Sequence, residues 1–204
     1  MPSSETVPRV PSRREKHKSH TSQALRRAAL ELFAAQGFDT TTTEEIAERA
    51  GVSVRTFFRY FPTKDLVLFL GRYDFVQEFI SGLLNQPKSA SDLDAVRAAF
   101  MASTPGFAER RKALRLYERA VASSPTLRGR EQDRQIEDVD AIAQAIATRR
   151  DLRVPDERCA LLAATGLLAY RRALGRWLAG PAGGEFAHAV ADEFALLEDL
   201  FAGN

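Results

Sequence analysis

The apolar residues of this chain recur three and four positions apart along almost its whole length, and no run alternates apolar and polar residues. Spacing of three and four places side chains on one face of an α-helix, whereas a period of two is typical of a strand. In the stretch Ser22–Phe38, for example, Leu25, Ala29, Leu32 and Phe33 share one side. The sequence therefore predicts an all-α fold of about nine helices.

Local signals mark the ends of the first two helices. Gly37 is suited to the left-handed conformation that closes a helix, so the first helix should end there. Thr42 is followed three positions later by Glu45, which is the pattern of a capping box. A short second helix should therefore start after Thr42 and end at Gly51.

A third short helix follows, with Ser53 as its cap and Pro62 as its stop. Phe57 and Phe61 are four residues apart, so both can be buried against the second helix. The residues on the other side of this helix are then Arg55, Thr56, Arg59 and Tyr60. After Pro62 the pattern predicts one long helix, capped by Thr63 and with apolar residues on one side as far as Leu83.

Two short helices joined by a glycine-containing turn and braced by a longer one form a helix-turn-helix. Such a third helix fits the major groove of duplex DNA with its first residues at the base edges. An ordinary helical hairpin with a solvated basic face would show the same pattern. Charge favours the first alternative, because residues 1–64 hold eleven Lys and Arg against seven Asp and Glu, in a chain of net charge +2.

Composition excludes several other classes of protein. Hydrophobic residues make up 45% and charged residues 27% of 204, which is typical of a folded water-soluble chain. The longest uncharged apolar run, Cys159–Tyr170, is too short to span a membrane. The first twenty residues have no apolar segment like that of a secretory signal, and a single cysteine precludes an internal disulfide. We therefore expect a cytoplasmic protein without a membrane partner.

The stretch TTTEEIAERAGVSVRTFFRYFPTKDLV, preceded by AALELFAAQGF, resembles the DNA-binding domain of TetR-type transcriptional regulators. The resemblance covers roughly residues 22–70 and implies that the third helix enters the major groove. Carried over by position, it implies DNA contacts from Thr42, Thr43, Ser53, Val54, Arg55, Thr56, Phe58, Arg59, Tyr60 and Lys64. Phe58 stands where the family often has tyrosine, so one phosphate hydrogen bond is lost there.

The resemblance further implies that residues 71–204 form a ligand-binding and dimerisation domain, with the last two helices joining a second copy. The surplus apolar surface of the segment Asp156–Ala179 agrees with a partner interface, although a buried helix would also explain it. The stretch RRKALRLYERAVASSPTLRGR resembles, more loosely, regulators of the mycofactocin-type actinobacterial subgroup, which implies an elongated hydrophobic or acyl effector. Pocket or core residues on this view are Phe100, Met101, Tyr117, Tyr170 and Trp177.

Three alternatives remain open from the sequence. A repressor that binds a palindromic operator as a dimer and an activator or architectural protein without a ligand share every feature of the first third. An enzyme has little support, since Glu185 and His188 form the only Glu-x-x-His spacing and no phosphate loop or catalytic triad is evident. No cofactor is predicted.

Residues 1–21 are expected to form a basic tail that is disordered in the free protein. Five arginines and lysines stand against two glutamates before Thr21, with three prolines and few apolar side chains. Such a segment either follows DNA phosphates or the minor groove as an arm, or is a solvated leader without a role.

Overall fold

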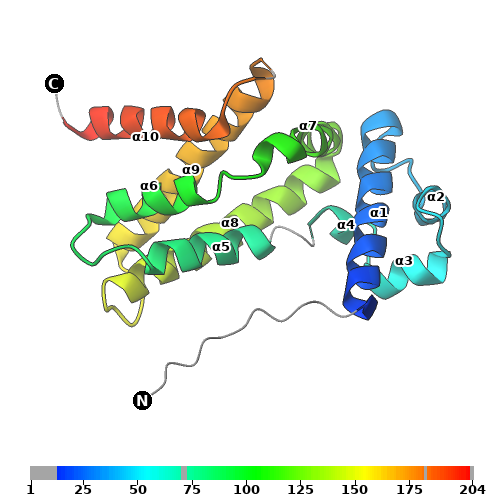
Figure 1. Cartoon of the computed structure of the whole chain (residues 1–204), viewed down its shortest axis with the longest axis horizontal. Helices are drawn as coiled ribbons and strands as arrows, with labels where there is room; N and C mark the ends of the chain where they lie inside the picture. The colour runs from blue at the N-terminus through cyan, green and yellow to red at the C-terminus, as the bar shows by residue number, and fades with distance from the viewer. Residues whose placement is uncertain (1–12, 70–72, 182, 203–204) are drawn as a thin grey trace. The chain divides into compact units, whose positions relative to one another are not determined.

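A computed structural model of the chain describes residues 13–69, 73–181 and 183–202 (Figure 1). Within these residues there are ten helices and no strand, which confirms the all-α prediction with one helix more than expected. They divide into two compact units, the first ending at Leu68 and the second beginning at Phe69. The boundary therefore falls inside the short helix α4 (Leu66–Phe69).

The first unit contains α1 (Arg13–Gln36), α2 (Thr43–Arg49) and α3 (Val54–Tyr60). Its core is made of apolar side chains from these helices, from the residues that follow them and from the start of α4: Leu25, Ala29, Phe33, Phe38, Ile46, Ala47, Phe57, Phe61 and Val67. Gly37 has φ 92°, and its N–H donates to the carbonyl of Phe33. The predicted left-handed end of the first helix is thereby confirmed.

Helix α1 begins earlier than the sequence pattern suggested. We expected it to start near Thr21, but it starts at Arg13, so residues 13–20 continue the helix rather than belonging to an irregular tail. Residues 1–12 lie outside the described part of the chain. No proline or glycine occurs between Ser12 and Gly37, and Arg, Lys and Glu favour helices, so extending an existing helix over these residues costs little.

The long helix predicted after Pro62 is described as two segments. The first, α4, begins at Leu66 rather than directly after Thr63, because the residues before it form a turn in which Leu68 N–H donates to the Asp65 carbonyl. The second, α5 (Tyr73–Leu84), follows residues 70–72, which are not described. Continuity between α4 and α5 therefore stays a prediction.

The second unit is a bundle in which α9 (Glu157–Ala179) packs against most of the others. Figure 1 shows α9 running diagonally through this unit. One side of α9 is buried along the length of the helix, with Cys159, Ala163, Tyr170 and Trp177 on it. The other helices are α5, α6 (Asp92–Ala102), α7 (Phe107–Ser123), α8 (Pro125–Arg149) and α10 (Phe186–Ala202).

A glycine sets the distance between α9 and α6. A Cβ added to Gly166 would lie 2.9 Å from a methyl carbon of Val96 and 3.3 Å from a ring carbon of Phe100. No side chain larger than hydrogen fits there unless these neighbours move. Gly166 therefore allows α6 to approach α9 closely.

The C-terminal end of α9 is capped by an arginine from α7. Arg111, which is buried, donates to the carbonyl oxygens of Trp177 at 2.6 Å, Gly180 at 2.7 Å and Pro181 at 2.7 Å. Its guanidinium also lies over the Trp177 ring at 4.7 Å. Carbonyls that the helix leaves without an amide partner are satisfied in this way.

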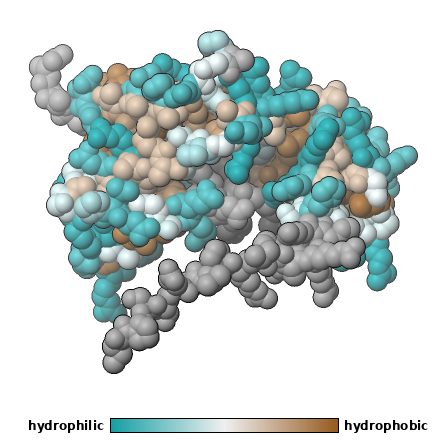
Figure 2. All heavy atoms as spheres, in the orientation of Figure 1, coloured by the Kyte–Doolittle hydropathy of each residue, from teal (hydrophilic) through white to brown (hydrophobic). Residues whose placement is uncertain are grey.

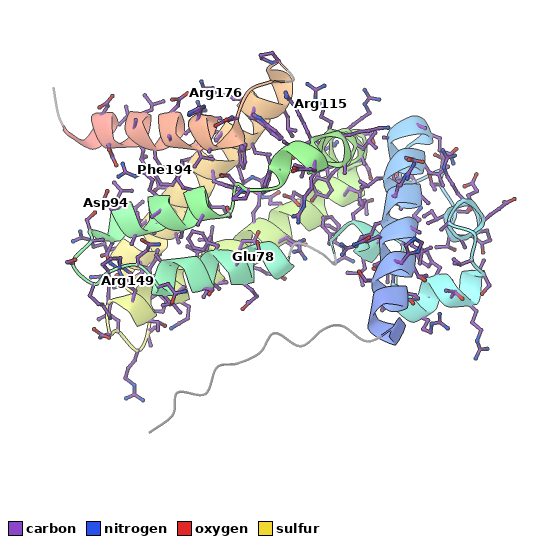
Figure 3. The ribbon with its side chains drawn as sticks, viewed as in Figure 1. Glu78, Asp94, Arg115, Arg149, Arg176 and Phe194 are labelled. Carbon is purple, nitrogen blue, oxygen red and sulfur yellow. The ribbon has the colours of Figure 1, made fainter. Side chains whose placement is uncertain are left out.

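A second buried arginine, Arg149 at the end of α8, binds the connection between α5 and α6. It donates to the carbonyl oxygens of Gln86 at 2.9 Å, Pro87 at 2.6 Å and Ala90 at 2.9 Å. Figure 3 shows Arg149 beside that connection. The sequence pattern groups Ile136 with Val139, Ile142 and Ile146 on the apolar side of this helix, but Ile136 is 59% exposed.

None of the helices in the described ranges combines the length and apolar character needed to cross a bilayer. In the view of Figure 2, hydrophilic side chains cover much of the surface, with apolar atoms showing between them.

Candidate nucleic-acid interface

Helix α2 is opened by the capping box that the sequence predicts. The Glu45 N–H donates to Thr42 Oγ1 at 3.2 Å, and the Thr42 N–H donates to the Glu45 carboxylate at 2.7 Å. The hydrogen bond from the Thr42 backbone, followed by one from the Gln36 side chain, lowers the pKa of Glu45 below its ordinary value. A charged Glu45 therefore fixes where α2 begins. Thr42 and the neighbouring Thr43 are left at the surface of this helix end, exposed and half-buried respectively.

The turn between α2 and α3 depends on a glycine with positive φ. Gly51 has φ 70°, a conformation that side chains with a Cβ rarely adopt. The N–H of Val52 then donates to the carbonyl of Ala47 at 2.9 Å. Ser53 caps α3, with its Oγ accepting from Thr56 N–H at 3.2 Å. This confirms the predicted caps and the helix-turn-helix geometry.

Helix α3 has one buried side and one presented side. Phe57 and Phe61 are 0% and 1% exposed and bury the helix against the unit core. Phe58, in contrast, is 47% exposed and meets Phe57 edge-on, with ring centroids 5.4 Å apart. Like Phe58, the other predicted contact residues of this helix and its cap lie at the surface, either exposed or half-buried. They are Ser53, Val54, Arg55, Thr56, Arg59 and Tyr60.

Two contacts orient side chains on the presented side. The Arg59 guanidinium carbon lies 5.3 Å from the centre of the Tyr60 ring. The hydroxyl oxygens of Ser53 and Thr56 are 3.0 Å apart, so one donates to the other. Arg55 has no such contact among the described residues and is exposed near the start of α3. The presented side therefore combines two cations, three hydroxyls and two aromatic rings.

Lys64 has a role that the sequence did not suggest. Its ammonium donates to the carbonyl oxygens of Phe38 at 2.6 Å and Thr41 at 2.8 Å, and it lies 4.2 Å from the centre of the Phe38 ring. Lys64 thus ties the start of α4 to the connection between α1 and α2. An ammonium has three donors, so one remains for an external acceptor.

A polar hollow of about 470 Å³ lies on α1 and the end of α2 and includes no residue of α3. Glu31 stands in it and binds Arg27 at 3.0 Å and Arg49 at 3.1 Å. The hydrogen bond from Arg27 lowers the pKa of Glu31, and a weaker one from Arg49 acts in the same direction. Together they outweigh burial, which alone would raise this pKa. Arg27 and Arg49 therefore neutralise the Glu31 carboxylate, and they do not belong to the presented side of α3.

The predicted pocket residues separate into two groups. Phe100, Tyr170 and Trp177 belong to the buried cluster of the second unit, where Phe100 stacks on Tyr170 at 4.7 Å, and Met101 packs against that cluster. Tyr117 lies elsewhere, with its hydroxyl donating to Glu131 and its ring edge-on to Phe69. Four of the five residues are thus brought to one cluster.

Glu131 was not singled out by the sequence pattern, yet it is a buried carboxylate. It is 4% exposed and accepts from Arg171 at 2.8 Å as well as from Tyr117. This group links α7, α8 and α9 within the second unit. The partners are 14 and 40 positions away in the chain, so no local spacing pointed to it.

The candidate metal pair of Glu185 and His188 is at the surface. His188 Nδ1 lies 3.6 Å from the Glu185 carboxylate, and both side chains are more than 70% exposed. Within the residues that the structure covers, no cluster of three or more His, Cys, Asp or Glu could hold a metal ion.

Helices α9 and α10 expose leucines that the rest of the unit does not cover. Leu161 and Leu168 of α9 are 66% and 59% exposed, and Leu196 and Leu200 of α10 are 47% and 71% exposed. Large apolar side chains gathered on neighbouring helices are typical of an interaction surface.

Comparison with protein-family models gives two matches. Residues 25–69 match the model of the bacterial regulatory proteins of the tetR family, and residues 90–202 match the MftR C-terminal domain. The second match alone covers more than half of the chain.

Two curated relatives are similar over part of their length. The HTH-type transcriptional regulator TcmR of Streptomyces glaucescens is 39% identical over 101 residues, which are 50% of this chain and 45% of TcmR. MftR of Mycobacterium tuberculosis, a protein assigned to the regulation of mycofactocin biosynthesis, is 37% identical over 92 residues, which are 45% of this chain and 46% of MftR. The chain thus spans about half the length of the curated relatives it matches.

A solved structure is similar over most of the chain. It is that of FadR from Thermus thermophilus, a TetR-family transcriptional repressor in complex with lauroyl-CoA. The likeness has 25% sequence identity and a TM-score of 0.56, and it covers 90% of this chain and 96% of FadR.

Proposed function

Because the chain belongs to the TetR family of bacterial regulatory proteins, with an MftR-type C-terminal domain, we propose that it is a transcriptional regulator that binds duplex DNA through α3. The presented side of α3 supports this proposal. Arg55 and Arg59 offer cations to bases and phosphates, while Phe57 and Phe61 hold the helix in place from behind. A helix of this kind fits the major groove.

The contact residues take different parts in the proposed complex. Ser53, Val54, Arg55 and Thr56 lie at the amino end of α3 and face base edges or the adjoining backbone. Thr42, Thr43, Arg59 and Tyr60 reach phosphates, and Phe58 packs on a sugar or a thymine methyl. Lys64 gives its third donor to a phosphate while its other two hold Phe38 and Thr41.

The experiment that tests DNA binding uses the full chain and fragments of the DNA that flanks its own gene. The double variant Arg55→Ala with Arg59→Ala is compared with Arg27→Ala with Arg49→Ala, which removes equal charge from the hollow around Glu31. We expect the first variant to lose specific binding and the second to keep most of it. Equal losses in the two variants would show that α3 has no special part.

The second unit is proposed to serve dimerisation and effector binding. We expect a homodimer through α9 and α10, since their exposed leucines need a partner surface. Two-fold symmetry then requires a palindromic operator with half-sites about one helical turn, roughly 34 Å, apart or a multiple of that. The protein acts in the cytoplasm, where the DNA is, and we propose no catalytic activity for it.

We further propose that the regulator is a repressor released by an elongated hydrophobic or acyl-type molecule. Two observations support this: FadR was solved with lauroyl-CoA, and the cluster around Phe100, Tyr170 and Trp177 is the main apolar interior of the second unit. Screening acyl-CoA thioesters by thermal shift and then by operator release tests the proposal. A tight binder that leaves operator affinity unchanged would instead favour a DNA-binding protein whose effector has another chemistry, or an activator without one.

A further inference from the structure

The exposed side chains of α9 and α10 form one stripe on each helix. On α9 the exposed residues Leu161, Ala164, Leu168, Arg172 and Gly175 recur at intervals of three and four, so they share a face. On α10 the same spacing joins exposed Asp192, Leu196, Asp199 and Leu200. Both stripes belong to the surface that the proposed dimer would cover.

The two helices run in opposite directions beside each other. Arg176, near the end of α9, contacts Asp192 and Glu193 in the first half of α10, whereas the more central Gly166 lies near Phe194. Figure 3 shows Arg176 beside the first turns of α10. Residues late in α9 are therefore next to residues early in α10.

This pairing divides the surface into an apolar end and a charged end. The apolar end has Leu161 and Leu168 from α9 with Leu196 and Leu200 from α10, and one exposed charge, Asp199, stands beside the leucines of α10. The charged end consists of Arg172 and Arg176 from α9 with Asp192 and Glu193 from α10. The leucines come early in α9 and late in α10, so on both helices they lie away from the charged end.

Within the charged end the charges are unevenly exposed. Glu193 is 3% exposed and accepts from Arg172 at 2.9 Å and Arg176 at 2.8 Å. Burial alone would raise the pKa of Glu193, but the hydrogen bonds from Arg176 and Arg172 lower it, so the carboxylate stays charged. The two arginine side chains remain 58% and 56% exposed, and Asp192 is 64% exposed. Outward, α9 thus presents positive charge and α10 presents the negative charge of Asp192.

We propose that the charged end selects the partner and the register of the dimer: two copies join with their apolar ends together, and Arg172 and Arg176 of each copy face Asp192 of the other. The inference rests on the proposed homodimer. In a two-fold interface the same patch of both copies meets itself, so opposite charges on α9 and α10 are self-complementary. In the opposite register the leucines of one copy would cover the arginines of the other and bury these cations without partners, which disfavours that register. A different protein with an apolar surface opposite the arginines would be disfavoured for the same reason.

A single substitution gives the first test. Asp192→Arg changes an exposed residue whose nearest cation is 3.9 Å away, so the fold should persist. In the homodimer it would place cations opposite Arg172 and Arg176, and we expect the dimer dissociation constant to rise at least about tenfold at low salt and to recover at high salt. The control Asp140→Arg makes the same charge change at an exposed position of α8. The inference is overturned if both variants dimerise like the parent protein.

Mixing two variants separates contacts between copies from contacts within one copy. In Arg176→Asp the α9 cation becomes an anion, so this variant also repels itself. A mixed dimer of Arg176→Asp with Asp192→Arg has opposite charges at both contacts, and native mass spectrometry of differently tagged chains should show it in clear excess. Repulsion inside one chain would persist after mixing, so a purely statistical mixture contradicts the inference.

If Arg176→Asp does not fold, Asp192→Arg is mixed with the parent chain instead. The spectra then compare the amounts of the parent homodimer, the mixed dimer and the variant homodimer, and the parent homodimer should dominate. A parent protein that is monomeric refutes the proposed dimer instead, which the same spectra reveal.

Discussion

The ammonium group of Lys64 lies 2.8 Å from the carbonyl oxygen of Thr41, the residue immediately before the cap of α2. This contact joins two connections of the first unit, the one before α2 and the one before α4. The position of Thr42 and Thr43, which we propose to bind phosphates, therefore depends on a side chain from beyond α3. Lys64 is at once a support and a candidate phosphate contact.

Replacing Lys64 by alanine should weaken both the fold and DNA binding. The carbonyls of Phe38 and Thr41 lose their donor, and we expect the free energy of unfolding to fall by about 1–3 kcal/mol in denaturant titration. DNA affinity should fall for all sequences alike, with a salt slope reduced by about one unit. Arg59→Ala is the control for stability, because an exposed side chain should change it by less than about 0.5 kcal/mol. Equal stabilities of the two variants would show that the Lys64 contacts contribute nothing.

Arg55→Ala should relax base preference rather than weaken all sequences alike. The residue stands at the amino end of α3, and losing a base contact costs about 1–3 kcal/mol at the cognate site. Binding to a library of operator variants, compared with that of Arg59→Ala, measures the effect. If Arg55→Ala binds every operator variant more weakly but keeps the order of preference of the parent protein, Arg55 contacts phosphates instead of bases.

Gly166→Ala should destabilise the second unit. Its new Cβ would lie within 2.9 Å of Val96 and 3.3 Å of Phe100, both fully buried, and relieving such overlap costs about 1–3 kcal/mol. The matched control is Gly129→Ala in α8, where nothing lies within 4 Å of the added atom. Alanine there should raise stability by about 0.5–1 kcal/mol, because it favours the helix. If the melting temperatures of both variants shift in the same direction, the close approach of α6 to α9 at Gly166 is contradicted.

Stability should fall in acid, because several carboxylates have a lowered pKa in the folded protein, Glu45 and Asp156 among them. The backbone hydrogen bond from Thr42 lowers the pKa of Glu45, and the Arg150 side chain, followed by Cys159, holds the pKa of Asp156 far below its ordinary range. A lowered pKa in the folded state stabilises the fold above the unfolded value, and this contribution disappears as the pH falls through the folded value. Melting temperatures should therefore decline progressively below about pH 4.5. Glu45→Gln should show a shallower decline, and an unchanged pH profile would exclude its part.

The basic start of α1 should act on DNA without supporting the fold. Replacing Arg13, Arg14, Lys16 and Lys18 by glutamine keeps a residue that favours helices while removing four charges. We expect operator affinity to fall most at low salt, with a shallower dependence between 50 and about 200 mM salt and an unchanged melting temperature. An unchanged slope would leave this segment as a solvated leader.

The sequence predicted those features of the site that depend on neighbours in the chain. The capping box of Thr42 and Glu45, the cap at Ser53 and the burial of Phe57 and Phe61 each follow from residues three or four positions apart, and all are confirmed. Lys64 binds carbonyls 23 and 26 positions away, and no local pattern reports such a contact.

The same distinction explains what was missed elsewhere. Glu131 is charged and would ordinarily be assigned to the surface, but Tyr117 and Arg171 on other helices make its burial possible. Arg111 is a cation inside the bundle because the end of α9 offers it carbonyls. The start of α1 was missed for another reason, since its first turns carry no apolar residues to mark a periodicity.

Only the side of α3 that carries Phe57 is needed for folding, and the following Phe61 secures its end. Arg55 and Arg59 are exposed and contribute almost nothing to the core, so they are free to change without loss of the folded state. Under the proposed binding through α3, natural variation can explore new operators by altering this helix alone. A designer can do the same by exchanging the presented side chains while leaving both phenylalanines in place. In a lineage where duplicated regulators acquire new target genes, this division of one short helix makes the change accessible in single steps.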